Sequence, residues 1–486
     1  MTDASTAAAR PQSGSPYNLG YKFLRIFADI RHGEAPKALL LALNIFLLLL
    51  AYYILKPLRE SLLLVDQKAP QVKSYLSGAQ AVLFVFVIKG FSRLASKVPR
   101  HVLITWTTSF FISNLVIFYF LHAGGMAIKP MGILFFIWVG IFNYFVIAQF
   151  WGFANDLYSD EVGKRTFPLV ALGATLGGLI ATLPFMKRLR DLLGDGWEFK
   201  LMLLAGIILF LCIALARYIH HRDVRKTRAD REKGLAGAAE KAKVQEQPLK
   251  AGGGFRLIFK SRYLLLIALM IGLYNFVNAT GEFIISSVTV NKSIGHPAGQ
   301  AQSAEALPSA SQSLPRQTES KAIHNAFMDY QFLTNLIALI IQLFLVSRIF
   351  KWVGVGGALL FLPLLALGGY ALISFGAVFL LVRWVKALEN GTDYSLQNTT
   401  KAALFLVTQR EEKYKAKAAI DTFFVRGGDT VSALAVLVGT QLLGLKIERY
   451  ALLNVVVVAV LIVVCLKIIP AYGKRKAASD AAAARP

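Results

Sequence analysis

The sequence predicts an all-α membrane protein with about twelve transmembrane helices. Of its 486 residues, 56% are hydrophobic and 17% are charged, and the mean hydropathy is +0.54. Soluble domains have a smaller apolar share. Apolar stretches of about 20 residues, the length that a helix needs to cross the bilayer core, recur between short polar segments. Because lipid offers the backbone no hydrogen bonds, these stretches should be helical.

The N-terminal segment, 1–37, should be cytoplasmic. Within it, the apolar side chains of 21–31 share one helical face with basic residues around it, which is typical of a helix on the membrane surface. Six membrane helices should then form an N-terminal half, 38–219. Their predicted ranges are 38–64, 74–95, 101–122, 130–156, 165–186 and 197–219.

A basic linker, 220–261, should lead to a C-terminal half, 262–469. The predicted helices of this half are 262–290, 323–349, 353–373, 375–398, 416–443 and 447–469. Residues 291–322 are rich in Ser, Gln, Ala and Pro and should form a disordered external loop. An even number of crossings, with a basic linker and a basic tail at 470–486, predicts cytoplasmic termini in a bacterial inner membrane.

Charge and motifs exclude several classes of function. The formal charge of +25 is explained by basic loops on one membrane side, so we expect no nucleic-acid partner. The sequence contains no GxxxxGK[ST], HExxH or GxSxG motif, and its two cysteines lie far apart. We therefore expect no catalytic residues, no metal and no cofactor, but a small-molecule substrate and contact with membrane lipid.

The two halves resemble distant repeats. FLRIF at 23–27 is echoed by FRLIF at 255–259, and YYILKPLRES at 52–61 can be laid over YNFVNATGEF at 274–283. The second overlay pairs Glu60 with Glu282. Parallel six-helix halves with a substrate site between them are the architecture of major facilitator transporters, so we predict a major facilitator-like fold.

The first predicted helix carries charges that are costly inside a membrane. Tyr52, Lys56, Arg59 and Glu60 can share one helical face, which predicts a cavity that meets an aromatic ring, two cations and a carboxylate. The alternative is that both cations extend to the membrane surface while Glu60 neutralises one of them.

Further charges interrupt the helices predicted at 375–398 and 416–443. Asp393 and Lys401 lie at the first, and Asp421 and Arg426 in the second. Lys401 is a candidate ligand contact, and the acidic residues with Arg426 are candidates for coupling or gating. For Asp421 and Arg426 a purely structural ion pair is an equal alternative.

Aromatic and amide side chains in two other helices are candidates for binding a planar base. Packing within the helix bundle is the more frequent role of such side chains. Asp156 ends the first of these helices and is a further gating candidate. The candidates are Asn143, Trp151 and Asn155 in 130–156, and Tyr274 and Asn278 in 262–290. Tyr52 of the first predicted helix is a further candidate for contact with the base.

Three stretches of the chain resemble the ATP/ADP antiporter family of plastids and obligate intracellular bacteria, which belongs with the major facilitator-like carriers. They are YILKPLRES at 53–61, FWGFAND with DEVGKRTFPLVALGA across 150–174, and SLQNTTK at 395–401 with KYKAKAAID at 413–421. The sequence departs from the family pattern in three places. Lys56 and Arg59 stand in exchanged order, and Asn398 and Thr399 replace the expected Asp-Pro. The glutamate expected near 139–143 is not present.

This resemblance implies exchange of adenine nucleotides, with Arg59 and Lys401 on the basic positions that take the phosphates. Lys56 is the third expected phosphate contact, because a nucleoside triphosphate carries several negative charges. Two alternatives remain open. One is a proton-coupled carrier of another organic anion or small solute, in which Glu282 titrates, and the other is a membrane scaffold without transport activity.

Overall fold

The computed structural model describes residues 34–95, 98–158, 160–232, 254–294, 316–409 and 412–483. Every regular element in these ranges is a helix. The surface helix predicted at 21–31 lies outside them. We call the end of the bundle at which the first described helix begins the termini side, and the opposite end the far side.

The described residues of the first half of the chain form seven helices, of which six are long. Each long helix follows one of the six apolar stretches. The short one, α7, follows α6 after a bend of 53°. Pro184 begins α7, a position at which its missing N–H breaks no helical hydrogen bond. The helices are α2 (Ala35–Leu63), α3 (Ala69–Ala95), α4 (Arg100–Ala123), α5 (Ile128–Leu157), α6 (Asp160–Ala181), α7 (Pro184–Leu193) and α8 (Trp197–Glu232).

The second half contains six further long helical segments, three of which include π-helical turns. Gly354, with a left-handed φ of 67°, lies inside α13 and breaks the continuous helical stretch formed by α12, η1 and α13. The elements are α10 (Gly254–Lys260), α11 (Arg262–Ile294), α12 (Arg316–Ile340) with η1 (Ile341–Leu345), α13 (Val346–Phe375), α14 (Phe379–Thr392) with η2 (Asp393–Gln397) and α15 (Asn398–Leu404), η3 (Glu412–Ala416) with α16 (Lys417–Ala419), η4 (Ile420–Phe424) and α17 (Val425–Gln441), and α18 (Ile447–Ala483).

The helix lengths and compositions agree with the predicted membrane protein. Nine helices within the described ranges are long and apolar enough to cross a membrane, or ten with the bent α6–α7 pair. Two causes account for the difference from twelve: Gln317–Phe375 counts once although Gly354 divides it, and α14–η2–α15 is too polar to count. The predicted fold class, about twelve helices in two halves, is confirmed.

Several helices extend beyond the predicted limits. α8 and α10 continue into both ends of the predicted linker 220–261, and α11 and α12 into both ends of the predicted loop 291–322. The predicted tail is helical as far as Ala483. Hydropathy detects only the part of a helix that lies in lipid, whereas polar helix formers can continue the helix into water.

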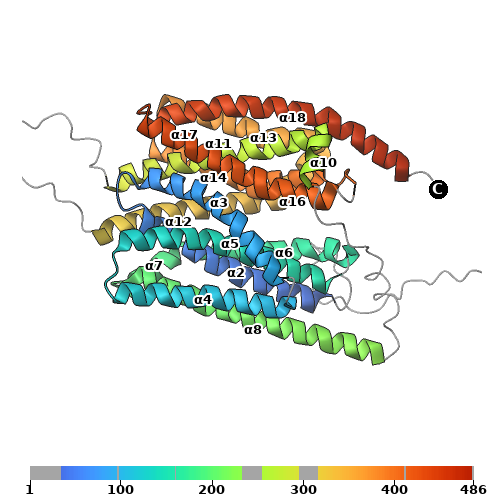
Figure 1. Ribbon diagram of the computed structural model, residues 1–486, viewed down its shortest axis with the longest axis horizontal. Helices are drawn as coiled ribbons and strands as arrows, with labels where there is room; N and C mark the ends of the chain where they lie inside the picture. Colours follow the sequence, from blue (N-terminus) through green and yellow to red (C-terminus); the bar gives the residue numbers. More distant parts are fainter. Residues whose placement is uncertain are drawn as a thin grey trace, which may run out of the picture.

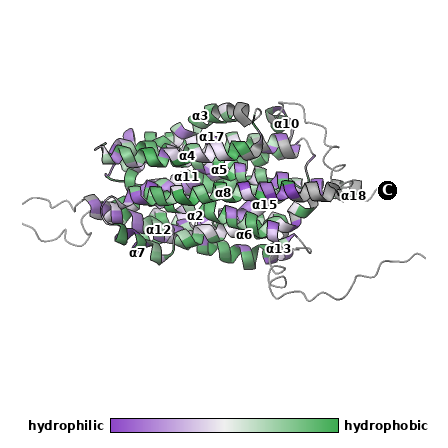
Figure 2. Ribbon diagram, turned by 90° about the horizontal axis from the view of Figure 1, so that it is seen from below, coloured by the Kyte–Doolittle hydropathy of each residue, from purple (hydrophilic) through white to green (hydrophobic). Residues whose placement is uncertain are grey.

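The two halves lie side by side as separate bundles, with α3 and α12 at the boundary between them (Figure 1). One large apolar core lies within the first half and two within the second. Many large apolar side chains are exposed on the described helices, and hydrophobic residues predominate along the middle of the bundle (Figure 2). This distribution is the one expected when lipid, and not water, surrounds the bundle.

Close contact between α2 and α6 depends on glycines. A Cβ atom added to Gly177 would lie 2.3 Å from the carbonyl oxygen of Phe46, and one added to Gly173 would lie 2.3 Å from that of Ala42. Small residues at such a spacing let two membrane helices approach backbone to backbone.

We expect Gly177→Ala to lower the free energy of unfolding by about 1–3 kcal/mol, because the added methyl group forces α2 and α6 apart. The thermal unfolding midpoint of the purified protein in detergent measures this change. Gly427→Ala is the matched control, since a Cβ atom there meets nothing within 4 Å. Equal midpoints for the two variants would contradict the close packing of α2 on α6.

Candidate functional site

A cavity of about 200 Å³ lies between the two halves. Four of the side chains that line it are basic (Lys56, Arg59, Lys73 and Arg426) and two are acidic (Glu282 and Asp429). The remaining lining residues include three aromatic rings and three amide side chains. These are Phe136, Phe283, Tyr394, Gln80, Asn278 and Asn390.

Four charged side chains form a continuous chain across the boundary between the halves. Glu60 accepts a hydrogen bond from its neighbour Arg59 and forms an ion pair of 2.8 Å with Lys73 of α3. Lys73 also lies 3.6 Å from Glu282 of α11 and donates to Ser286, at 2.9 Å. Glu60 and Lys73 are 3% and 6% exposed, whereas Glu282 is 29% exposed. The two glutamates paired by the repeat overlay therefore share one lysine.

Lys56 lies on the same side of α2 and reaches the second half. Its ammonium group donates to the Gln331 amide oxygen of α12, at 3.1 Å. The same group lies 5.5 Å from the ring centre of Tyr53 and 5.9 Å from that of Tyr394. Lys56 thus has no carboxylate partner among the described residues, which leaves its charge available to an anion.

Next to the cavity, Lys386 and Glu389 form a fully buried ion pair. Their charged atoms are 2.9 Å apart and both side chains are 0% exposed. Tyr370 donates to Glu389 at 2.7 Å, and the ammonium group donates to Asn278 at 3.0 Å. Because a buried charge is costly unless it is paired and hydrogen-bonded, this pair fixes α14 against α11 and α13.

Two polar side chains connect this buried region to Glu282. Tyr330 donates to Glu282 at 3.0 Å, and the Asn390 amide donates to it at 3.2 Å. Glu282 therefore accepts hydrogen bonds from α12 and α14 while it faces Lys73 of α3. The position of this one carboxylate depends on both halves.

A second cavity, of about 300 Å³, lies nearer the termini side within the second half. Lys401 lines it, 3.0 Å from Asp393 and 5.1 Å from the ring centre of Tyr274. Asp421 also lines it and pairs with Lys417, one helical turn earlier. Lys401 is therefore in a different cavity from Lys56 and Arg59, although all three were predicted as phosphate contacts.

Arg426 and Asp421 do not form the ion pair that was the structural alternative. The Arg426 guanidinium lies 3.2 Å from Asp429 and 4.3 Å from the Phe84 ring centre of the first half. Asp421 is bonded to Lys417 instead. Asp421 of η4 and Arg426 of α17 therefore line two separate cavities.

The predicted base-binding residues are divided among several places. Asn278 lines the central cavity and Tyr274 the second one. Tyr52 packs edge to face on Tyr53, and Trp151 packs on Phe167 of α6. Among the described residues, the linings of these two cavities do not include Asn143, Trp151, Asn155 or Asp156. Asn155 and Asp156 are exposed near the termini end of α5.

Sequence reasoning missed three residues at the centre of the site: Lys73, Asn390 and Tyr394. The predicted helix began at 74, because the polar start of α3 lowers its hydropathy, so Lys73 was assigned to a loop. Asn390 and Tyr394 lie in a predicted helix with many polar residues. The spacing of these residues in the sequence does not show which of them face a cavity and which are buried between helices. Their positions emerge only when α14 and η2 pack on α2 and α11.

The far side of the bundle is closed by contacts between the halves. An apolar cluster that includes Leu64, Val290 and Phe327 draws residues from both halves. Polar contacts surround it. They are Lys187 with Asp329, Arg190 with Asn325 at 2.6 Å, Ser320 with Glu198 at 2.9 Å, and Tyr75 with Thr440 at 2.9 Å.

Comparison with known sequences agrees with the resemblance noted in the motifs. The family model for the TLC ATP/ADP transporter matches residues 130–284. The ADP,ATP carrier protein 1 of Chlamydia muridarum is 26% identical over 463 residues, which cover 82% of this chain and 81% of that protein. The chloroplastic ADP,ATP carrier protein 2 of Arabidopsis thaliana is 24% identical over 326 residues, which cover 59% of this chain and 46% of that protein.

Comparison with solved structures identifies the fold. The nucleoside transporter NupG superposes with a TM-score of 0.57 at 12% identity, over 89% of this chain and 98% of that one. An auto-inhibited POT family peptide transporter has a TM-score of 0.57 at 12% identity, over 90% and 97%. The predicted transporter class, in place of an enzyme, is confirmed by the sequence relatives. The chain is a multi-pass membrane protein with a major facilitator-like fold, and its sequence is similar to those of ADP,ATP carriers.

Proposed function

We propose that the protein exchanges adenine nucleotides, ATP against ADP, across a membrane by alternating access. One observation carries the proposal: four basic side chains against two acidic ones line a cavity between the halves. Polyphosphate is the substrate group that such an excess of cations favours, since Arg and Lys make charge-assisted hydrogen bonds to phosphate oxygens. The names of the sequence relatives support the same substrate class.

The two cavities give each predicted phosphate contact a separate role. A nucleotide entering from the termini side would first meet Lys401, which Asp393 holds over the Tyr274 ring. Its phosphates would then reach Lys56 and Arg59 in the central cavity. Lys56 already lies beside the Tyr394 ring, so that ring and the amides of Asn278 and Asn390 would accept the base there.

The charge chain suggests why transport would be an exchange. With the far side closed, Lys73 is held between Glu60 and Glu282, and so joins the halves. Opening the far side without substrate would separate this buried lysine from one carboxylate, which is costly. A bound polyphosphate would replace that carboxylate as the partner of Lys73. Reorientation would therefore require a nucleotide in each direction.

The distribution of basic residues indicates how the protein is oriented in the membrane. We propose that the termini side faces the cytoplasm of a bacterium, with the protein in its inner membrane. Basic residues at the ends of α8, α10 and α18, among them Arg225, Lys260 and Lys474, lie on this side, and Lys and Arg are retained on the cytoplasmic side of short loops.

Ligand-induced stabilisation of the purified protein tests the proposal. ATP and ADP at about one hundred times their Kd should stabilise the fold by about 2.7 kcal/mol, whereas adenosine should give little shift. Arg59→Gln combined with Lys401→Gln should lose this response, and Lys68→Gln, at the exposed start of α3, should keep it. Equal shifts from adenosine and ATP would contradict phosphate recognition.

A further inference from the structure

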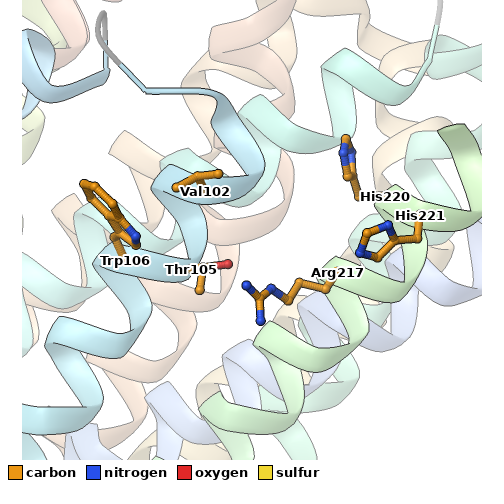
Figure 3. A pocket seen from close by; sticks show the side chains of 6 residues that line it. All are labelled: Val102, Thr105, Trp106, Arg217, His220 and His221. Carbon is orange, nitrogen blue, oxygen red and sulfur yellow. The ribbon is translucent and has the colours of Figure 1, made fainter.

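A third cavity lies outside the boundary between the halves, at the termini end of the groove between α4 and α8. Its volume is about 420 Å³. Three of its six lining side chains are Arg217, His220 and His221 of α8, and none of the six is acidic. Arg217 extends from α8 toward Thr105 of α4, and Trp106 stands beside Thr105 (Figure 3).

The height of this cavity along the bundle coincides with a membrane surface. α8 begins at Trp197 on the far side, and Arg217 follows twenty residues later. At 1.5 Å per residue these positions are about 30 Å apart, which equals the thickness of the hydrocarbon core. Arg217 and the two histidines therefore lie where the headgroups of one leaflet begin. Trp106, which is 57% exposed, has the position of an interfacial aromatic anchor.

The helix faces next to the cavity are suited to acyl chains. On α4, Phe110 is 59% exposed, and on α8, Phe210 and Leu211 are 63% and 49% exposed. These side chains follow the cavity toward the middle of the bilayer. An apolar surface that begins at a cationic pocket matches a molecule with an anionic head and hydrocarbon chains.

We propose that this cavity binds the phosphate of an anionic phospholipid from the leaflet on the termini side. The guanidinium of Arg217 would bind two phosphate oxygens, with ring nitrogens of His220 and His221 as further donors. Trp106 would pack on the glycerol region, and the acyl chains would lie along Phe110 and Phe210. Basic pockets between membrane helices on the cytoplasmic side bind such headgroups.

Free phosphate and nucleotides share this headgroup chemistry. Their contacts would end at the pocket, however, and would leave the apolar groove toward Phe110 and Phe210 unused. The lipid is also concentrated in the membrane beside the pocket. The anionic lipid is therefore the ligand that contacts both the basic pocket and the apolar groove. This proposal does not depend on the substrate that the central cavity transports.

Native mass spectrometry of the full-length protein tests the lipid site. The protein is delipidated, incubated with phosphatidylglycerol or with phosphatidylcholine of the same chains, and ejected from detergent. We expect a retained phosphatidylglycerol molecule that phosphatidylcholine does not replace. The triple variant Arg217→Gln, His220→Gln and His221→Gln should reduce its occupancy at least about fivefold, because the headgroup loses every donor on α8.

Arg348→Gln combined with Lys351→Gln is the matched control, since both side chains are exposed on the termini side of the second half and their loss removes two formal charges. This variant should retain the lipid. Arg217→Gln alone, with an unchanged elution volume, serves if the triple variant misfolds. Equal occupancy by phosphatidylcholine, an equal loss in the control, or displacement of the bound lipid by millimolar inorganic phosphate would overturn the proposal.

Discussion

Replacing Lys73 by methionine is expected to reduce nucleotide exchange at least about tenfold. The ammonium group of Lys73 is the shared partner of Glu60 and Glu282, so its loss leaves Glu282 without its lysine in the cavity and Glu60 paired with Arg59 alone. The cavity would then have three basic and two acidic lining residues, and each phosphate contact would compete with repulsion by a carboxylate. A tenfold loss corresponds to about 1.4 kcal/mol, the scale of one charge-assisted hydrogen bond.

The same variant should also loosen the far side. A cysteine at Val290, which is 0% exposed within the far-side cluster, reports this opening through its rate of reaction with a membrane-impermeant maleimide. The native Cys212 and Cys465 are buried and give a low background. Faster labelling is expected with Lys73→Met and not with Lys68→Met, the exposed control five residues earlier. Unchanged exchange and labelling would show that Lys73 does not join the halves.

The second large effect is expected at the buried pair of Lys386 and Glu389. Lys386→Met leaves Glu389 without its cation in a place where both side chains are 0% exposed. Removing one member of such a pair costs about 3–5 kcal/mol, because the remaining charge is neither solvated nor paired. The thermal unfolding midpoint and the yield of folded protein should both fall.

A double variant separates charge from packing. Lys386→Met with Glu389→Gln removes both charges and keeps an acceptor for Tyr370, so it should be more stable than Lys386→Met alone. Lys467→Met, on the exposed face of α18, is the surface control and should leave the midpoint unchanged. A double variant as unstable as the single one would assign the loss to packing of the lysine chain and not to charge.

The fold was accessible from sequence because lipid imposes a strong and simple constraint. Each crossing needs a long apolar run, so each of the twelve predicted ranges lies mostly within observed helix, although 165–186 and 375–398 run across breaks between helices. Helix ends were less accessible. The polar extensions of α8 and α18 depend on contacts and helix propensity in water, which a hydropathy pattern does not measure.

The site was only partly accessible from sequence. Intramembrane charge drew attention to Lys56, Arg59 and Glu282, and the structure places these three side chains in the lining of one cavity. The same signal cannot tell how far along the bundle axis a charge lies. Lys401 follows Tyr394 by seven residues, or about 10 Å of helix, and so lies in the second cavity. The partner of Glu60 was missed because a lysine at a polar helix end has no signal of burial until α3 packs against α11.

Exchange of labelled nucleotide in proteoliposomes tests the central claim most directly. Vesicles containing the purified protein are loaded with ADP or left empty, at equal pH inside and outside, and labelled ATP is added outside. We predict rapid uptake only in the loaded vesicles, and release of the label when unlabelled ADP is later added outside. Uptake that is equally fast into empty vesicles, or that a pH gradient drives without internal nucleotide, would contradict the account.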